Sequence, residues 1–278
     1  MNKILGKVLL ISCVCATVVQ GNPFVSANNL PEQTLQNVKQ ENSLRVLAPK
    51  VKNDNAKVFD YQQSKEKNKL KHTFKVSASA TDTVIEIPFE SSNEEYLKLY
   101  KNKEGKTGTV GNIYNKEGKS IGIFSVTLDG EQNPENVTAS TDANTLRLNV
   151  KGTNRTEPYQ MVLSTETTYY STYFNSFEWI TRDSDYPLSL SLNHTNYFYE
   201  GPTQWDIGIR AADAWDKVVA VHSGSPNWSN ASGLEDQLLC HVHYASNKNP
   251  WNIEPSRPDY SWTGTVVDFC NPGSGIWD

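Results

Sequence analysis

None of the short motifs that mark common catalytic sites occurs in this chain of 278 residues. There is no Gly-x-Ser-x-Gly elbow, no His-Glu-x-x-His pair, no Walker loop and no dinucleotide-binding fingerprint. These absences remove the usual sequence signals of serine hydrolases, zinc proteases, nucleotide hydrolases and nicotinamide-dependent enzymes. We therefore expect no cofactor and no metal ion.

Positive charge and long apolar segments are also scarce. The chain has 26 Lys and Arg against 31 Asp and Glu, and from Tyr173 to Asp278 the balance is 5 against 13, a formal charge of −8. An acidic surface repels phosphate groups, so we expect no nucleic-acid partner. Past the first 27 residues, no stretch approaches the roughly 20 apolar residues that cross a bilayer, so we expect no transmembrane segment.

The first 27 residues have the three-part order of a secretory signal peptide. Lys3 and Lys7 form a positive start, and the segment from Val8 to Val19 is mostly apolar. This segment is about a dozen residues long, which is too short to span a membrane. Val25-Ser26-Ala27 is a small-x-small cleavage site. The pattern predicts a secreted protein whose mature chain begins at Asn28.

A lipid anchor is the alternative, because Leu10-Ile11-Ser12-Cys13 fits a bacterial lipoprotein box that would be acylated at Cys13. The residues after it, Val14 to Val19, stay mostly apolar, whereas a lipidated tether is usually polar there. This difference favours release. Removal of the signal leaves Cys240 and Cys270, which we expect to form one disulfide in an oxidising compartment.

Composition divides the rest of the chain into three segments. Residues 28–71 are rich in Asn, Gln and Lys without a sustained period, which predicts a flexible leader. Residues 72–165 contain short strand-like runs separated by turn residues, which predicts a β-sandwich-like domain. All seven tryptophans of the chain lie in residues 166–278, from Trp179 onward. We expect a small α+β domain in this segment, tied by the disulfide. The expected fold class is therefore β-rich and two-part.

Three elements of the last segment are predicted by their periodicity. The run from Leu188 to Asn193 alternates, which indicates a half-buried strand. A helix with Thr203 as its N-cap and Asp206 in a near capping box is predicted by one apolar stripe: Trp205, Ile209, Ala212, Trp215 and Val219. A second helix, with Ser232 as its N-cap, is predicted by helical spacing of Leu234, Leu238, Val242 and Ala245.

Three motifs follow one another near the carboxy terminus. They are Asp236-Gln237-Leu238-Leu239-Cys240-His241, the run from Lys248 to Pro258, and Cys270-Asn271-Pro272. Together they resemble the bacterial domain-of-unknown-function 2599 family, whose members read DQ-hydrophobic-x-CH, K-x-x-WNLEPxRP and CNP. The resemblance covers roughly Phe177 to Pro272, with Ile253 where Leu is usual. It implies a bacterial, exported protein with a preceding β-rich region, and it implies no chemistry.

The motifs also concentrate titratable residues near the expected disulfide. One hypothesis is a hydrolytic site in which His241 is the general base and Glu254 or Asp236 is its partner. The other is structural, with His241 bonded to a backbone carbonyl and Glu254 paired with Arg257. His243 adds no metal pair, because residues two apart on a helix point roughly 200° apart. The structural interpretation is favoured.

Aromatic residues support a binding function instead. Trp251, Trp262 and Trp277 lie among polar and turn residues, and exposed aromatic rings bind sugars and partner surfaces. The alternative is that these rings cover a small disulfide-tied domain that has little other core. With Arg257, Trp251 and Trp262 form a candidate surface-binding set. We expect a monomeric, non-enzymatic interaction protein that binds an extracellular or cell-surface partner. The alternative is a secreted hydrolase or toxin-like effector using His241, which would require that ring to line an exposed cleft.

Overall fold

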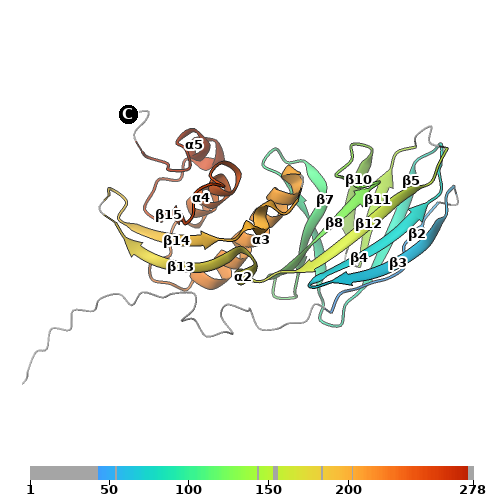
Figure 1. Ribbon diagram of the computed structural model, residues 1–278, viewed down its shortest axis with the longest axis horizontal. Coiled ribbons are helices and arrows are strands. Elements are labelled where there is room, and N and C mark those ends of the chain that lie inside the picture. The colour runs from blue at the N-terminus through green and yellow to red at the C-terminus, as the bar shows by residue number, and fades with distance from the viewer. Residues whose placement is uncertain are drawn as a thin grey trace, which may run out of the picture.

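The computed structural model describes residues 43–53, 55–142, 144–152, 156–182, 184–201 and 203–274 (Figure 1). The predicted signal peptide, with Cys13, lies outside the described residues, as does Trp277. About 41% of the structure is strand and 21% is helix, so the expected β-rich class is confirmed. No helix in the described part of the chain is both long and apolar enough to span a membrane.

Two antiparallel sheets occupy the first half of the described chain. One has five strands: β1 (Arg45–Val46), β2 (Lys50–Val51), β5 (Thr83–Glu90), β10 (Val137–Asp142) and β11 (Thr145–Val150). The other has seven: β3 (Val58–Glu66), β4 (Lys69–Val76), β6 (Tyr96–Lys101), β7 (Thr107–Tyr114), β8 (Ser120–Leu128), β9 (Glu131–Gln132) and β12 (Tyr159–Thr167). Their main orders are β1-β5-β11-β10 and β3-β4-β12-β8-β7-β6.

Side-chain alternation along these strands builds one apolar core. In β5, Ile85, Ile87 and Phe89 are buried, while the residues between them are partly exposed. Phe74 of β4 and Met161 of β12 pair across the other sheet and join the same cluster. Burying each such side chain stabilises the fold by about 1.5–3 kcal/mol. The period of two in the sequence therefore places the core between the two sheets.

The prediction of a flexible leader is wrong for most of the leader residues that the structure describes, 43–53 and 55–71. Strands β1, β2 and β3 lie within residues 45–66, and the predicted boundary at residue 72 falls inside β4. Strand β3 is at the edge of its sheet and its side chains are almost all exposed. An exposed edge strand buries no apolar face, so its sequence carries no alternation and is as polar as that of a flexible segment.

The carboxy-terminal region combines a small sheet with helices. The three strands are antiparallel in the order β13 (Phe174–Thr181), β14 (Leu188–His194) and β15 (Trp251–Ile253). The helical elements are α2 (Tyr170–Tyr173), the 3-10 turn η2 (Asn196–Tyr199), α3 (Gln204–His222), α4 (Ala231–Tyr244) and α5 (Ser261–Val267). Leu192, Trp215 and Leu238 belong to the single core cluster that joins this sheet to α3 and α4.

Local signals placed these elements well, with two corrections. Thr203 caps α3, and Asp206 completes the capping box as predicted. Helix α4 begins after Asn230, so Ser232 is not its N-cap; the Ser232 hydroxyl instead bonds Asp259. Strand β14 is present, but it is more than half buried, because Ser189 lies inside the protein beside other polar groups.

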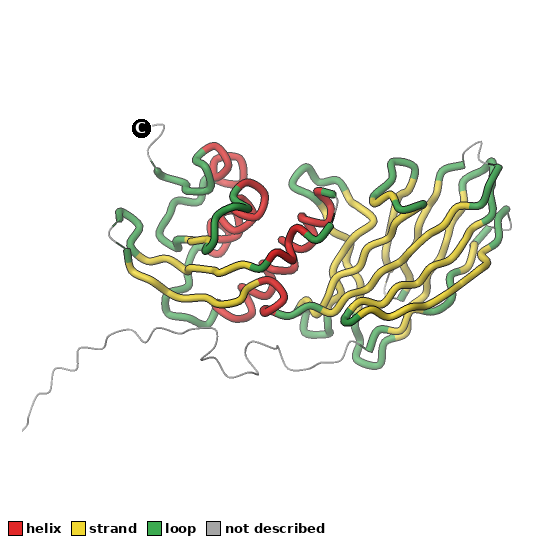
Figure 2. Tube along the Cα trace, in the orientation of Figure 1, coloured by secondary structure: helices red, strands yellow, loops and turns green. Residues whose placement is uncertain are grey.

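Helix α3 joins the two regions. It contacts β7 and β8 on one side and α4 on the other, and Figure 2 shows it between the larger sheets and the carboxy-terminal elements. Asp213 of α3 is fully buried. Its carboxylate accepts hydrogen bonds from Thr168 Oγ1 and Tyr173 Oη at 2.6 Å each, and from the Ser120 hydroxyl. Lys217 Nζ, also buried, is 3.4 Å from Asp213 and donates to the Ser120 carbonyl.

The expected disulfide is present between Cys240 and Cys270, whose sulfur atoms are 1.99 Å apart. It ties α4 to the loop that follows α5. The confirmed pair closes a loop with a sequence separation of 30 residues.

Replacing this disulfide should destabilise chiefly the carboxy-terminal region. For Cys240→Ser we expect a loss of about 3–4 kcal/mol of unfolding free energy, because the unfolded chain gains the entropy of the opened loop. Urea unfolding of the oxidised wild type and the variant measures this difference. Two thiols that react with a labelling reagent in the native wild type would contradict the prediction.

Candidate functional site

The His241 ring lies inside the protein on α4. Its exposed fraction is 5%, and its Nδ1 donates to the Gln237 carbonyl oxygen at 2.7 Å. Burial lowers the pKa of His241 from 6.5 to about 4, so the ring is neutral at pH 7. A buried, neutral ring bonded to its own helix has the surroundings that the structural interpretation requires.

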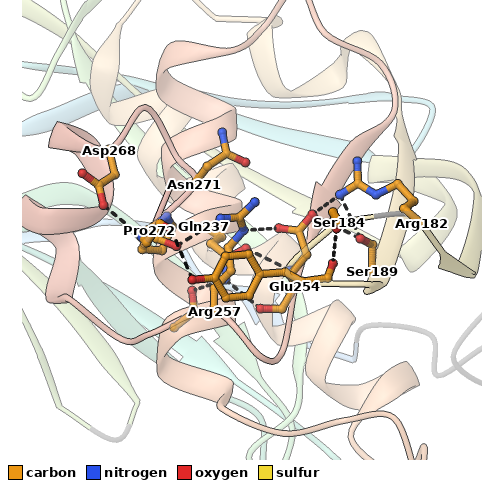
Figure 3. Close-up of polar contacts among 12 residues, drawn as sticks. Arg182, Ser184, Ser189, Gln237, Glu254, Arg257, Asp268, Asn271 and Pro272 are labelled. Atoms are coloured by element: carbon orange, nitrogen blue, oxygen red, sulfur yellow. Dashed lines mark hydrogen bonds and ion pairs between the residues drawn. The ribbon is translucent and has the colours of Figure 1, made fainter. Parts of the chain in front are cut away.

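Glu254 is the centre of a buried polar cluster (Figure 3). Its side chain is 1% exposed, and its carboxylate pairs with Arg182 and with Arg257 Nε, the latter at 2.7 Å. Ser189 Oγ donates to the same carboxylate at 3.1 Å. The Gln237 amide bonds both backbone groups of Glu254, at 2.9 and 3.1 Å. Both carboxylate oxygens are therefore occupied by donors.

Arg257 extends this cluster to the last motif. Its Nη1 donates to the Pro272 carbonyl at 3.0 Å, and its guanidinium lies 4.4 Å from the centre of the Tyr186 ring. Tyr186 Oη donates to the Gly273 carbonyl at 3.2 Å, and the Gly273 amide donates to Asp268 at 3.0 Å. The motif residues thus meet in one closed network that fastens the chain after α5 to the small sheet.

Asp236, the other carboxylate of the hydrolytic hypothesis, faces elsewhere. Its Oδ1 is 3.0 Å from Lys103 Nζ in the loop between β6 and β7. Asp236 therefore joins α4 to the larger sheet, while Glu254 is held by two arginines. In the part of the chain that the structure describes, no hydrogen bond joins His241, Glu254 and Asp236 to one another: each bonds a different partner. Among the described residues, no three His, Cys, Asp or Glu side chains are grouped closely enough to hold a metal ion.

Trp251 is not a surface residue, which corrects the candidate binding set. Its exposed fraction is 0%, its indole N–H donates to the Ala245 carbonyl at 3.0 Å, and its ring stacks on His194 at 3.9 Å. Trp251 begins a sheet strand, so the turn residues around it in the sequence do not bring it to the surface. Arg257 is mostly buried as well. Trp262, the third member of the set, lines a cleft.

This cleft lies between the β6–β7 loop and the carboxy-terminal helices and has a volume of about 270 Å³. We call it the aromatic cleft, after the rings that line it: Tyr100, Trp205, His243, Tyr244 and Trp262. The first belongs to β6, and the others to α3, α4 and α5. Its walls therefore come from both regions of the chain.

The rings of the aromatic cleft are set at different angles. Tyr100 and Trp205 meet edge to face, with centroids 6.1 Å apart. Tyr244 and Trp262 are inclined by 33° at 6.3 Å, and the Tyr244 side chain is 65% exposed. Gly108 makes room for this arrangement, because a Cβ at that position would lie 2.6 Å from the Trp205 ring. The close approach of β7 to α3 thus needs glycine.

Charges around the aromatic cleft largely cancel. Lys103 pairs with Asp236 and also lies 5.3 Å from the Trp262 ring centre, which is a cation–π contact. Glu104 pairs with Lys106 at 3.0 Å. Burial and the neighbouring Lys103 lower the pKa of His243, so this imidazole is neutral at pH 7. The cleft consequently offers aromatic surface and hydrogen-bonding groups without a strong net charge.

Sequence reasoning missed most of this cleft. The apolar stripe predicts that Trp205 lies on the buried face of its helix, and helical spacing gives His243 no metal pair, yet both residues line the cleft. Tyr100 and Lys103 come from a hairpin more than a hundred residues away from Trp205 in the sequence. Only the packing of α3 on β7 and β8 brings them together. The available signal was the tryptophan-rich composition, which indicated the region and left the partners open.

Comparison with known proteins places the second region in context. Residues 175–273 match the family model described as "Protein of unknown function (DUF2599)", which confirms the resemblance. Uncharacterized protein Rv0477 of Mycobacterium tuberculosis and uncharacterized protein Mb0487 of Mycobacterium bovis are each 38% identical to the chain over 73 residues. That stretch is 24% of this chain and 47% of either relative. The chain therefore spans about half the length of the curated relatives it matches.

Substitution of His241 separates a structural role from a catalytic one. We expect His241→Ala to lower the unfolding free energy by about 1–3 kcal/mol, because the Gln237 carbonyl loses its ring donor in a buried site. His243→Ala on the same helix is the matched control and should have a smaller effect, because that ring is partly exposed. Thermal and urea unfolding of the three proteins provide the comparison.

The difference in stability between wild type and His241→Ala should also depend on pH. A pKa lowered in the folded state means that the unfolded chain takes up the proton first. The contribution of His241 to the unfolding free energy of the wild type is therefore fully present above pH 6.5, and it is lost as the pH falls towards 4. The difference between wild type and His241→Ala should narrow over that window. A His241→Ala protein that melts like wild type and lacks a measurable biological activity would instead favour the hydrolase.

Proposed function

We propose that the protein is exported from a bacterial cell and acts outside it as a non-enzymatic binding protein, with the aromatic cleft as its binding site. The observation that carries this proposal is the cleft itself. It presents several partly exposed rings and neutral hydrogen-bonding groups on two walls. Clefts with mostly apolar linings and a few placed polar groups are typical of binding sites.

The burial of the alternative catalytic residues supports binding over hydrolysis. A general base must reach a substrate, and a catalytic carboxylate needs an oxygen free to accept a proton or a bond. His241 is buried and bonded to Gln237, while both Glu254 oxygens are taken by arginine and serine donors. A monomer with an accessible cleft meets the needs of a binding protein without further groups.

We infer a two-part organisation beneath this function, with a β-sandwich-like domain followed by a small disulfide-tied α+β domain. Two separate large core clusters support it, one built from the strands before residue 167 and one from the elements after it. A third, small cluster lies between them and contains Val110, Ile123 and Ile209. Trp205 and Tyr100 pack against that small cluster, so the aromatic cleft borders the junction of the two parts.

Export is supported by two features of the chain. The first 27 residues follow the order of a signal peptide, and the remaining cysteine pair is a disulfide, which persists in oxidising compartments. The cleavage pattern favours release of the protein, and acylation at Cys13 is the alternative.

Substitutions at the aromatic cleft should abolish binding without unfolding the protein. We expect Tyr244→Ala and Trp262→Ala each to reduce retention of the labelled protein on a cell surface by at least about tenfold, the effect of losing a central aromatic contact. Phe269→Ala is the matched control, because that ring is 70% exposed and does not line the cleft. The surfaces are bacterial cell walls, bacterial outer membranes and animal cells. Equal retention of all four proteins on every surface contradicts the proposal.

Processing gives an independent test of export. Intact-mass measurement on culture supernatant should find a chain that begins at Asn28 and carries no lipid, because the cleavage site and the polar residues after it agree. Recovery only in the membrane fraction, with a diacylglycerol mass on Cys13, would show that the protein is lipid-anchored and would contradict its release.

A further inference from the structure

The aromatic cleft has the combination of surfaces that a sugar ring needs. A pyranose has an apolar face of C–H groups and a rim of hydroxyls, so it packs flat on an aromatic ring while its edge forms hydrogen bonds. Tyr244 and Trp262 offer inclined ring faces at the mouth. Gln204, exposed at the start of α3, and Asn102, in the hairpin loop, add amide groups to the lining of the same cleft.

Asn102 is held ready by its own loop. Its Oδ1 accepts the backbone N–H of Glu104 at 3.1 Å and that of Lys106 at 2.9 Å. These bonds fix the side chain, and a fixed polar group loses little entropy when it binds a hydroxyl. With both lone pairs of Oδ1 occupied, Asn102 offers its Nδ2 group as a donor to a hydroxyl, while the Gln204 amide provides both a donor and an acceptor.

The charges of the cleft give no advantage to an anionic ligand. Lys103 is already paired with Asp236 and Lys106 with Glu104, so neither cation is left uncompensated. Glu235 lies on α4 near Tyr100 and Lys103, and burial raises the pKa of its carboxyl group. An anionic glycan or nucleic acid would find no unpaired lysine here to bind it. A neutral ligand needs none.

The size of the cleft and its edges disfavour a peptide. A volume of about 270 Å³ lies just below the ~300–1,000 Å³ of small-molecule sites, and a helix of roughly 10 Å diameter does not fit. A peptide could instead add a strand to β6, the edge of the seven-stranded sheet. That edge carries Lys98 and Lys101, and lysines on edge strands discourage such pairing.

From these features we propose that the aromatic cleft binds a short neutral carbohydrate, one or two sugar rings at the end or side of a surface glycan. The inference rests on the proposed binding function and names its ligand. Tyr244 and Trp262 stack on the ring faces. Gln204 and Asn102 bond the hydroxyls.

The indole N–H signals of the mature protein provide a direct test. In titrations with chitobiose, cellobiose, maltose and lactose, at least one sugar should shift the signals of Trp205 and Trp262 and leave that of the buried Trp251 unmoved. Assignment uses Trp→Phe variants. Tyr244→Ala should weaken the affinity at least about tenfold, because one aromatic ring that stacks on the sugar is lost. Phe269→Ala should leave the affinity unchanged. Shifts of Trp251 alone, or tighter binding of a uronic-acid disaccharide, would overturn the inference.

Treatment of the cell surface separates this inference from the proposed function. Periodate cleaves vicinal diols in glycans, and protease removes proteins. If retention depends on Tyr244 and periodate abolishes it, a carbohydrate is bound. If retention depends on Tyr244 and is abolished by protease but not by periodate, the carbohydrate inference is wrong and the binding function stands. Retention that is independent of Tyr244 removes both.

Discussion

The buried charge of Asp213 is the constraint on which the arrangement of this protein depends. A carboxylate without exposure is tolerated only where donors surround it, and its donors come from β8, α2, the segment before α2 and α3 itself. Helix α3 places Asp213 among all of these donors in a single position on the larger sheet. That position sets the first turn of α3, with Trp205, against Tyr100 of β6. The aromatic cleft is a consequence of this seating.

The three motifs that carry the family resemblance in this sequence serve a second, separate purpose. Gln237, Glu254, Arg257 and Pro272 belong to the closed polar network, and the Cys240–Cys270 disulfide ties the same helix to the chain after α5. These residues stabilise the carboxy-terminal region as a platform. The rings of the cleft stand at the ends of its helices. A resemblance carried by the platform therefore indicates the fold of this region, and the ligand has to be argued from the cleft.

The fold was predictable where the signal was local. Capping at Thr203 and the stripe that includes Trp215 predicted α3, and an even cysteine pair predicted the disulfide. Strand β3 escaped because an exposed edge strand has no apolar period. Trp251 was misplaced because a three-residue strand between turns looks like a turn in the sequence. Asp213 lies off the predicted apolar stripe, and only tertiary packing shows that a second face of α3 is buried.

The measurement that tests this account most directly is the unfolding free energy of Asp213→Asn compared with the double variant Asp213→Asn/Lys217→Met, read together with the Trp205 indole signal. The single variant leaves the Lys217 charge buried without its partner, so it should lose about 3–5 kcal/mol and shift the Trp205 signal. The double variant removes that charge and should recover most of the loss. A single variant that unfolds at the wild-type urea concentration, with an unmoved Trp205 signal, would contradict the claim that this buried pair seats α3 and shapes the cleft.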